Sequence, residues 1–170
     1  MLAINAEKRK EDNNKDKRIL VVDNEKDILL LLQLILEQNG FNVSLFDSPL
    51  AALSNFKIGL YDLAILDIRM PQMNGFELHE KIKQIDKSAK ICFITATGEE
   101  RYYYDQFIEK KKREGEEREE NERRIGVGEQ HQYQHQQHQQ EQYFHEFNKA
   151  TFLKKPISNV DLVREVNRII

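Results

Sequence analysis

Four residues that can handle phosphate or a metal ion stand at comparable places in this sequence: Asp23, Asp67, Thr95 and Lys155. Each ends or closely follows a short apolar run of the kind that forms a strand buried on both faces. Carboxylate oxygens suit a hard cation such as Mg²⁺, and a carboxylate can also act as a nucleophile. Taken singly, however, Asp23 and Asp67 would be interpreted as caps of a helix or turn.

Strand-like and helix-like segments alternate along the chain, and this alternation decides where the four residues meet. The predicted strands cover residues 18–22, 41–46, 63–66, 90–95 and 151–154. The predicted helices cover residues 25–38, 49–56 and 76–84, and a last helix, capped by Ser158, has Val160, Leu162, Val163, Val166 and Ile169 available for its apolar side. This order predicts an α/β fold with a doubly wound parallel sheet and helices on both faces. Its ligand site lies outside the carboxyl ends of the strands, where the four residues should converge.

Two polar segments do not fit this pattern. Residues 1–17 are predicted to form a disordered polar tail. Some fifty residues separate the fourth and fifth predicted strands, which is more than one crossover needs. Within them, about 109–142 is a low-complexity insertion, first charged and then rich in Gln and His, with either a solvated helix or disorder expected for its charged part. The histidines are interpreted as members of this tract without chemistry of their own.

Composition narrows the class of protein. The chain has 170 residues, 39% of them hydrophobic and 32% charged, with a net charge of -3, so we expect one domain and no attraction to nucleic acid or to an anionic membrane. No segment is apolar for long enough to be a signal peptide or a membrane span, which predicts a cytoplasmic protein. The single cysteine, Cys92, lies in an apolar run and is predicted to be a buried structural thiol.

Four blocks of the sequence resemble the receiver domain of response regulators, the CheY-like family of two-component signalling. The blocks are ILVVDNE at 19–25, LDIRMPQMNG at 66–75, ITA at 94–96 and FLKKP at 152–156. The spacing Asp-x-x-Met-Pro-x-Met-x-Gly is highly specific, and the likeness covers residues 18–170 apart from the insertion. It implies a flavodoxin-like five-stranded sheet with the strand order 2-1-3-4-5.

The resemblance also implies a Mg²⁺ site. Its ligands would be Asp23, Asn24, Asp67 and the backbone carbonyl of Arg69. The family usually has two consecutive acids where this chain has Asp23 and Asn24, and an amide oxygen brings no charge. We therefore expect weaker Mg²⁺ binding and slower phosphorylation than in a receiver with both acids. Glu25, which is placed to start the first helix, is expected to compensate only in part.

The remaining roles implied by the resemblance concern the phosphoryl group. Asp67 would be the phosphoacceptor, with Lys155 and Thr95 as its partners. Thr95 and Phe152 would form the switch, because the aromatic side chain moves inward when the threonine moves. The small Ala96 would leave room for the phosphoryl donor.

These roles predict a phosphorylation-activated signalling switch. A sensor histidine kinase or phosphotransfer protein would supply the phosphoryl group in a Mg²⁺-dependent reaction, and the chain would catalyse at most its own phosphorylation and dephosphorylation. No output domain follows the last helix in this sequence, so we expect a single-domain response regulator that signals by protein contact. The leucines of 29–32 suggest either a docking or homodimer surface or, more simply, burial beneath the last helix.

Three other functions are alternatives to this one. A pseudo-receiver would share the fold but take no phosphoryl group, because Asn24 and the insertion would have disabled it. An aspartate-nucleophile phosphohydrolase also uses a strand-end aspartate and Mg²⁺, but it needs a second acid two residues later, where this chain has Arg69. A flavodoxin-like cofactor site is disfavoured because the loop after the first strand is acidic where an anion would sit.

Overall fold

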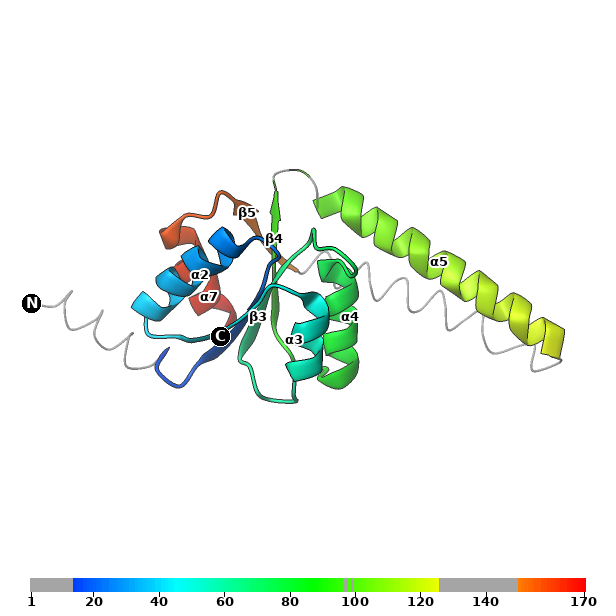
Figure 1. Ribbon diagram of the computed structural model, residues 1–170, viewed down its shortest axis with the longest axis horizontal. Helices are drawn as coiled ribbons and strands as arrows, with labels where there is room; N and C mark the ends of the chain where they lie inside the picture. Colours follow the sequence, from blue (N-terminus) through cyan, green and yellow to red (C-terminus); the bar gives the residue numbers. More distant parts are fainter. Residues whose placement is uncertain (1–13, 97, 99, 126–149) are drawn as a thin grey trace, which may run out of the picture. The chain divides into compact units, whose positions relative to one another are not determined.

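The computed structural model describes residues 14–96, 98, 100–125 and 150–170 (Figure 1). The predicted tail at 1–17 therefore falls largely outside the described residues, as does the Gln/His-rich part of the insertion. The chain divides into two compact units, Met1–Thr97 with Thr151–Ile170, and Gly98–Ala150. Each unit is considered by itself below.

The first unit is built on a five-stranded parallel sheet with the order β2-β1-β3-β4-β5. This confirms the predicted α/β fold and strand order. The strands are β1 (Arg18–Val22), β2 (Asn42–Phe46), β3 (Leu63–Asp67), β4 (Ile91–Ala96) and β5 (Thr151–Lys155). The three central strands are almost entirely buried, as expected of strands covered on both faces.

Helices α2 and α7 cover one face of the sheet, and α3 and α4 cover the other (Figure 1). Their bounds are α2 (Lys26–Gln38), α3 (Pro49–Asn55), α4 (Gly75–Ile85) and α7 (Asn159–Ile169). Ser48 and Ser158 cap α3 and α7 as predicted, because each side chain accepts a backbone N–H of the first turn. Gly40 follows α2 with φ +87°, which is the left-handed conformation expected after a helix end.

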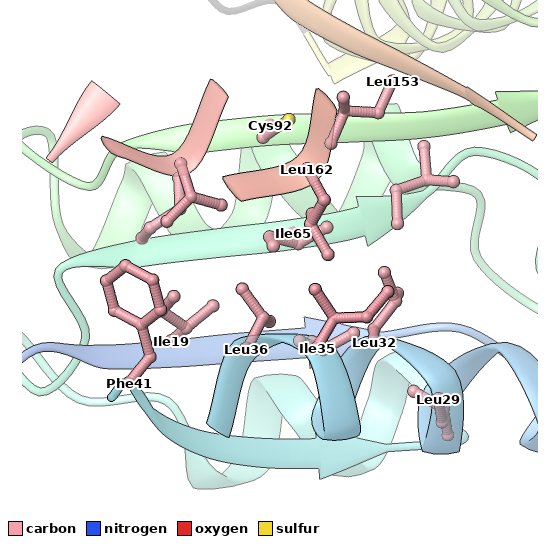
Figure 2. Packing of buried hydrophobic residues seen from close by; sticks show 14 residues of the cluster. Ile19, Leu29, Leu32, Ile35, Leu36, Phe41, Ile65, Cys92, Leu153 and Leu162 are labelled. Atoms are coloured by element: carbon pink, nitrogen blue, oxygen red, sulfur yellow. The ribbon is translucent and has the colours of Figure 1, made fainter. Parts of the chain in front are cut away.

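The core between the sheet and the helices α2 and α7 is continuous (Figure 2). Ile19 and Ile65 from the central strands pack with Leu32 and Leu36 of α2 and with Leu162 of α7. Cys92 is fully buried in the same cluster, and burial raises the pKa of its thiol to about 12. The predicted structural role of this cysteine agrees with its burial.

Two expectations about the helices are wrong. Val160 was expected on the apolar side of the last helix, but it is 73% exposed because it lies in the first turn of α7, away from the buried Leu162 and Val166. Leu30 and Leu31 were expected to lie beneath that helix, but they are exposed, since α2 presents Leu29 and Leu32 to the core instead. The leucine run therefore surrounds more of α2 than the core can bury.

The second unit contains α5 (Glu100–Ile125), a helix rich in Glu, Lys and Arg. The charged part of the predicted insertion is thus helical as far as Ile125, and α5 crosses the residues near 109 where that insertion was expected to start. Residues 126–149, which include the histidine tract, lie outside the described residues. Among the helices that the structure describes, none is long and apolar enough to cross a membrane.

Two leucines of α2 offer a matched test of this packing. Leu32 is fully buried, whereas Leu34 is 55% exposed on the same helix. We expect Leu32→Ala to lower the free energy of unfolding by about 2–5 kcal/mol, because it leaves a cavity, and Leu34→Ala to change it by less than about 0.5 kcal/mol. Urea unfolding followed by circular dichroism measures both. Equal losses in the two variants would contradict the packing described.

Candidate functional site

The carboxyl ends of four strands bring the predicted residues to one edge of the sheet. Asp23 directly follows β1, and Asp67 is the last residue of β3. The parallel register pairs Asp67 with Ile94 and Ala96 with Lys155, so Lys155 lies two residues beyond the level of Asp67, and its long side chain spans the remaining distance to the Asp67 carboxylate. Strand pairing therefore places Lys155 beside Asp67 although the two are far apart in sequence.

The ammonium group of Lys155 is the centre of the site. Its Nζ lies 3.0 Å from Asp23 Oδ2, 3.0 Å from Asp67 Oδ1 and 2.7 Å from Glu25 Oε1. Three carboxylates thus share one ammonium, and the shortest of these contacts is the hydrogen bond that Lys155 donates to Glu25. The structure brings Asp23, Asp67 and Lys155 together as predicted and adds Glu25 to them.

Asp23 is held in place by its neighbours in the chain. Its backbone N–H donates to the carbonyl of Phe46 at 3.2 Å, and its Oδ1 accepts the backbone N–H of Glu25 at 2.8 Å. Its other oxygen, Oδ2, is buried and has no hydrogen-bond partner among the described residues, although Lys155 Nζ is near it. Buried carboxylate oxygens normally have a partner, and here the ammonium of Lys155 supplies the nearby positive charge, so a metal ion would share or replace this contact.

Asp67 is positioned by the loop that follows it. The backbone N–H of Arg69 donates to its carboxylate, and the N–H of Gly75 donates to the carbonyl of Ile68 at 3.0 Å. A Cβ atom at Gly75 would lie 2.5 Å from the backbone oxygen of Asp67, so only glycine allows the loop to return this closely. Gln72 within the loop has φ +71°, an uncommon conformation for a residue other than glycine.

The pocket carries more negative than positive charge. Burial and then the charge of Asp23 raise the pKa of Asp67 to about 6, and burial also raises the pKa of Asp23. Burial opposes the charge of Lys155 as well, but the hydrogen bond to Glu25 and the contacts with the two aspartates outweigh it and raise the pKa of this lysine. The raised pKa values of Asp67, Asp23 and Lys155 all mean that the site stabilises added positive charge.

These features fit a Mg²⁺ ion. Asp23 and Asp67 offer two buried carboxylates, and one of their oxygens has no hydrogen-bond partner, which is the oxygen chemistry that Mg²⁺ prefers. The structure describes no group of three or more His, Cys, Asp or Glu side chains arranged to hold a metal ion. Asn24 and Arg69 are both exposed beside the pocket, and their parts in metal binding stay predictions.

Thr95 and Ala96 end β4 beside the two carboxylates. Thr95 is 2% exposed, and its hydroxyl donates to the carbonyl of Ala96 at 2.9 Å. The hydroxyl is therefore engaged by the backbone rather than directed at Asp67. Ala96 is half-buried opposite Lys155.

Phe152 belongs to an aromatic stack on the sheet face that α4 covers. Its ring is stacked on that of Phe93 with a centroid distance of 5.5 Å, and Phe93 also packs against Phe76 of α4 at 4.8 Å. Phe93 lies two residues before Thr95 on β4. Phe152 therefore contacts the strand that carries Thr95, and through Phe93 it is linked indirectly to α4.

Two features of the site were not found in the sequence. One is the contact between Glu25 and Lys155, which are far apart in the chain. The other is the capping box of α4, in which Asn74 Oδ1 accepts the N–H of Glu77 and Glu77 Oε2 accepts the N–H of Asn74, both at 2.9 Å. The spacing of Asn74 and Glu77 is a signature that could have been recognised.

Comparison with known proteins agrees with this arrangement. Residues 19–111 match the family model described as the response regulator receiver domain. The chain belongs to this family. It is 37% identical over 79 residues to the response regulator receiver protein CpdR of Brucella abortus (46% of this chain, 66% of CpdR) and 35% identical over 89 residues to the chemotaxis protein CheY of Bacillus subtilis (52% and 74%).

The fold is also that of solved receiver domains. The non-phosphorylated HemR receiver domain of Leptospira biflexa superposes with a TM-score of 0.59 at 22% identity, covering 91% of this chain and 94% of that chain. Against longer relatives the match is partial, since the chain covers only 37% of the transcriptional regulatory protein SpaR of Bacillus subtilis. The family match ends at Lys111, so the place of Lys155 in this receiver rests on the pairing of β5 with β4.

The charge imbalance predicts how stability depends on pH. The pKa of Asp67 in the folded protein, about 6, lies above its ordinary value of 3.8, so its ionisation opposes folding. This cost is absent below about pH 4, grows toward pH 6 and is complete above it. Asp67→Asn should therefore raise the free energy of unfolding at neutral pH, by at most about 3 kcal/mol, and leave it unchanged near pH 4. Chemical unfolding in metal-free buffer at both pH values measures this.

Asp62 supplies a control of opposite sign. Although burial opposes it, the hydrogen bond from the backbone N–H of Arg18 and the contact with Lys17 lower the pKa of Asp62. Its ionised form therefore favours folding, and Asp62→Asn should destabilise the protein at neutral pH and have little effect in acid. Destabilisation by Asp67→Asn at neutral pH would contradict the charge balance described.

Proposed function

We propose that this receiver domain accepts a phosphoryl group on Asp67 from a sensor histidine kinase or a phosphotransfer protein. The observation that carries the proposal is the buried Asp67 carboxylate, 3.0 Å from the Lys155 ammonium at the carboxyl edge of the sheet. A nucleophile and a fixed positive charge are thus already adjacent. Membership of the receiver family supports the same function.

In the transfer, the protein would form a single covalent bond, from Asp67 to phosphorus, and its other residues would position and stabilise the reacting groups. One carboxylate oxygen of Asp67 would form a bond to phosphorus while the bond from phosphorus to the imidazole nitrogen of the donor breaks and the imidazole keeps the electron pair. Lys155 would neutralise charge on the phosphoryl oxygens as it leaves the oxygen of Asp67. The chain would catalyse at most this reaction and the later hydrolysis of the acyl phosphate, in which water takes the phosphoryl group and inorganic phosphate leaves the Asp67 carboxylate.

A Mg²⁺ ion bound by Asp23 and Asp67 would neutralise further charge on the phosphoryl oxygens. Of the chain's own residues, Asp23 would be held in position by the backbone N–H of Glu25. Asn24 and the carbonyl of Arg69 complete the ligand set that we propose.

The signal would begin at Thr95. For its hydroxyl to donate to a phosphoryl oxygen, it must leave the carbonyl of Ala96. Phe152 would respond through its stack on Phe93, which lies on the same strand as Thr95. The phosphorylated state would thus favour another arrangement of β4 and β5, and a downstream protein that binds this arrangement would receive the signal. We propose protein contact as the output and a cytoplasmic location.

Intact mass spectrometry after incubation with acetyl phosphate and Mg²⁺ tests the proposal. The wild-type protein should gain the mass of one phosphoryl group, and Asp67→Asn should gain none. An unchanged mass for the wild-type protein would instead favour a pseudo-receiver, the binding module of the same fold that Asn24 and the insertion would have disabled.

Asn24 allows a separate test of the metal site. Asn24→Asp restores the second acid that the family usually has, and the added charge should tighten Mg²⁺ binding by about five- to tenfold. Isothermal titration calorimetry measures the binding. Asp47→Asn is a matched control, because it removes a charge from an exposed aspartate after β2. An unchanged Mg²⁺ affinity in Asn24→Asp would exclude residue 24 from the metal site.

A further inference from the structure

Glu25 occupies the N-cap position of α2 but does not cap the helix. Its side chain makes no cap hydrogen bond, and it instead accepts a hydrogen bond of 2.7 Å from Lys155, a residue of the most distant strand in sequence. Glutamate is not among the residues preferred at an N-cap. The position is thus better explained by the contact with Lys155 than by the helix.

The three carboxylates around Lys155 are not equivalent. Asp23 and Asp67 are almost completely buried, whereas the side chain of Glu25 is 51% exposed. The ammonium therefore lies between an inner pair of carboxylates and one outer carboxylate. Glu25 can follow a movement of Lys155 toward solvent, while the two aspartates are fixed by their strands and by backbone hydrogen bonds.

A divalent cation bound by the inner pair changes this balance. It would repel the ammonium and take over the two carboxylates that Lys155 now shares. Resting on the function proposed above, we propose that Glu25 is a positioning residue that holds Lys155 at the mouth of the pocket when Asp23 and Asp67 bind a divalent cation. Among the residues that the structure describes, the ion pairs of Lys155 are those with Glu25, Asp23 and Asp67, so without Glu25 the ammonium would keep only the two aspartates and compete with the cation for them.

A direct role for Glu25 as a metal ligand is the alternative. The structure favours the indirect role, because the backbone N–H of Glu25 is committed to Asp23 and its carboxylate to Lys155. The two roles make different predictions once Lys155 is removed, since an effect that acts through the ammonium must then disappear.

The first comparison uses Mg²⁺ binding by the full chain, measured by isothermal titration calorimetry. Glu25→Gln should weaken binding by about three- to fivefold, as expected for the loss of a half-exposed ion pair. Asp27→Asn is the matched control, because Asp27 is an exposed acid of the same helix turn; it should weaken binding less than twofold. Equal effects of the two substitutions would overturn the inference, since only general charge would then be at work.

The second comparison repeats both substitutions in a Lys155→Met background. There Glu25→Gln should weaken binding no more than Asp27→Asn does, and a loss as large as in the wild-type background would make Glu25 a ligand and overturn the inference. If Lys155→Met does not fold, equal effects of Glu25→Gln and Asp27→Asn in the first comparison would still overturn the inference. A wild-type protein that binds no Mg²⁺ would refute the proposed metal site as well, whereas normal binding by both wild type and Glu25→Gln would refute this inference alone.

Discussion

The carboxyl edge of this sheet depends on one ammonium group surrounded by three carboxylates. Lys155 offsets the repulsion between Asp23 and Asp67, whose buried oxygens would otherwise face each other without a cation. Burial raises the pKa of Asp67, the charge of Asp23 raises it further, and the single positive charge of Lys155 offsets only part of this rise. A site in this condition favours the binding of positive charge.

Strand pairing delivers this ammonium to the aspartates. The residues between β4 and β5 are numerous, yet the register still sets Lys155 opposite Ala96, two residues beyond Ile94, which is the partner of Asp67. The helix α5 within that connection is highly charged and belongs to a separate compact unit. The apolar sequence of each central strand causes that strand to be buried in the sheet. Because the buried strands pair in a fixed register, they also fix the geometry of the site.

The strands and the meeting of Asp23, Asp67 and Lys155 were predictable, because apolar runs ending in polar residues indicate a parallel sheet and the edge where its ligand site lies, whereas the strand order followed from the resemblance to receiver domains. Side-chain choices were not. Whether Leu30 or Leu32 faces the core depends on the exact rotation of the helix about its axis, and the acceptor of the Thr95 hydroxyl, which is the carbonyl of Ala96, depends on the side-chain rotamer. Glu25 and Lys155 follow or end strands that are far apart in the sequence, so no local sequence pattern predicts their contact.

The central claim is that Lys155 holds Asp67 ready for a phosphoryl group and transfers its contact to that group. A crystal structure of the protein with Mg²⁺ and beryllofluoride, a phosphoryl mimic, tests it most directly. We predict beryllium bonded to a carboxylate oxygen of Asp67, a cation between Asp23 and Asp67, and Lys155 Nζ in contact with a fluorine. Beryllofluoride absent from Asp67, with Lys155 still paired to both aspartates, would contradict the account.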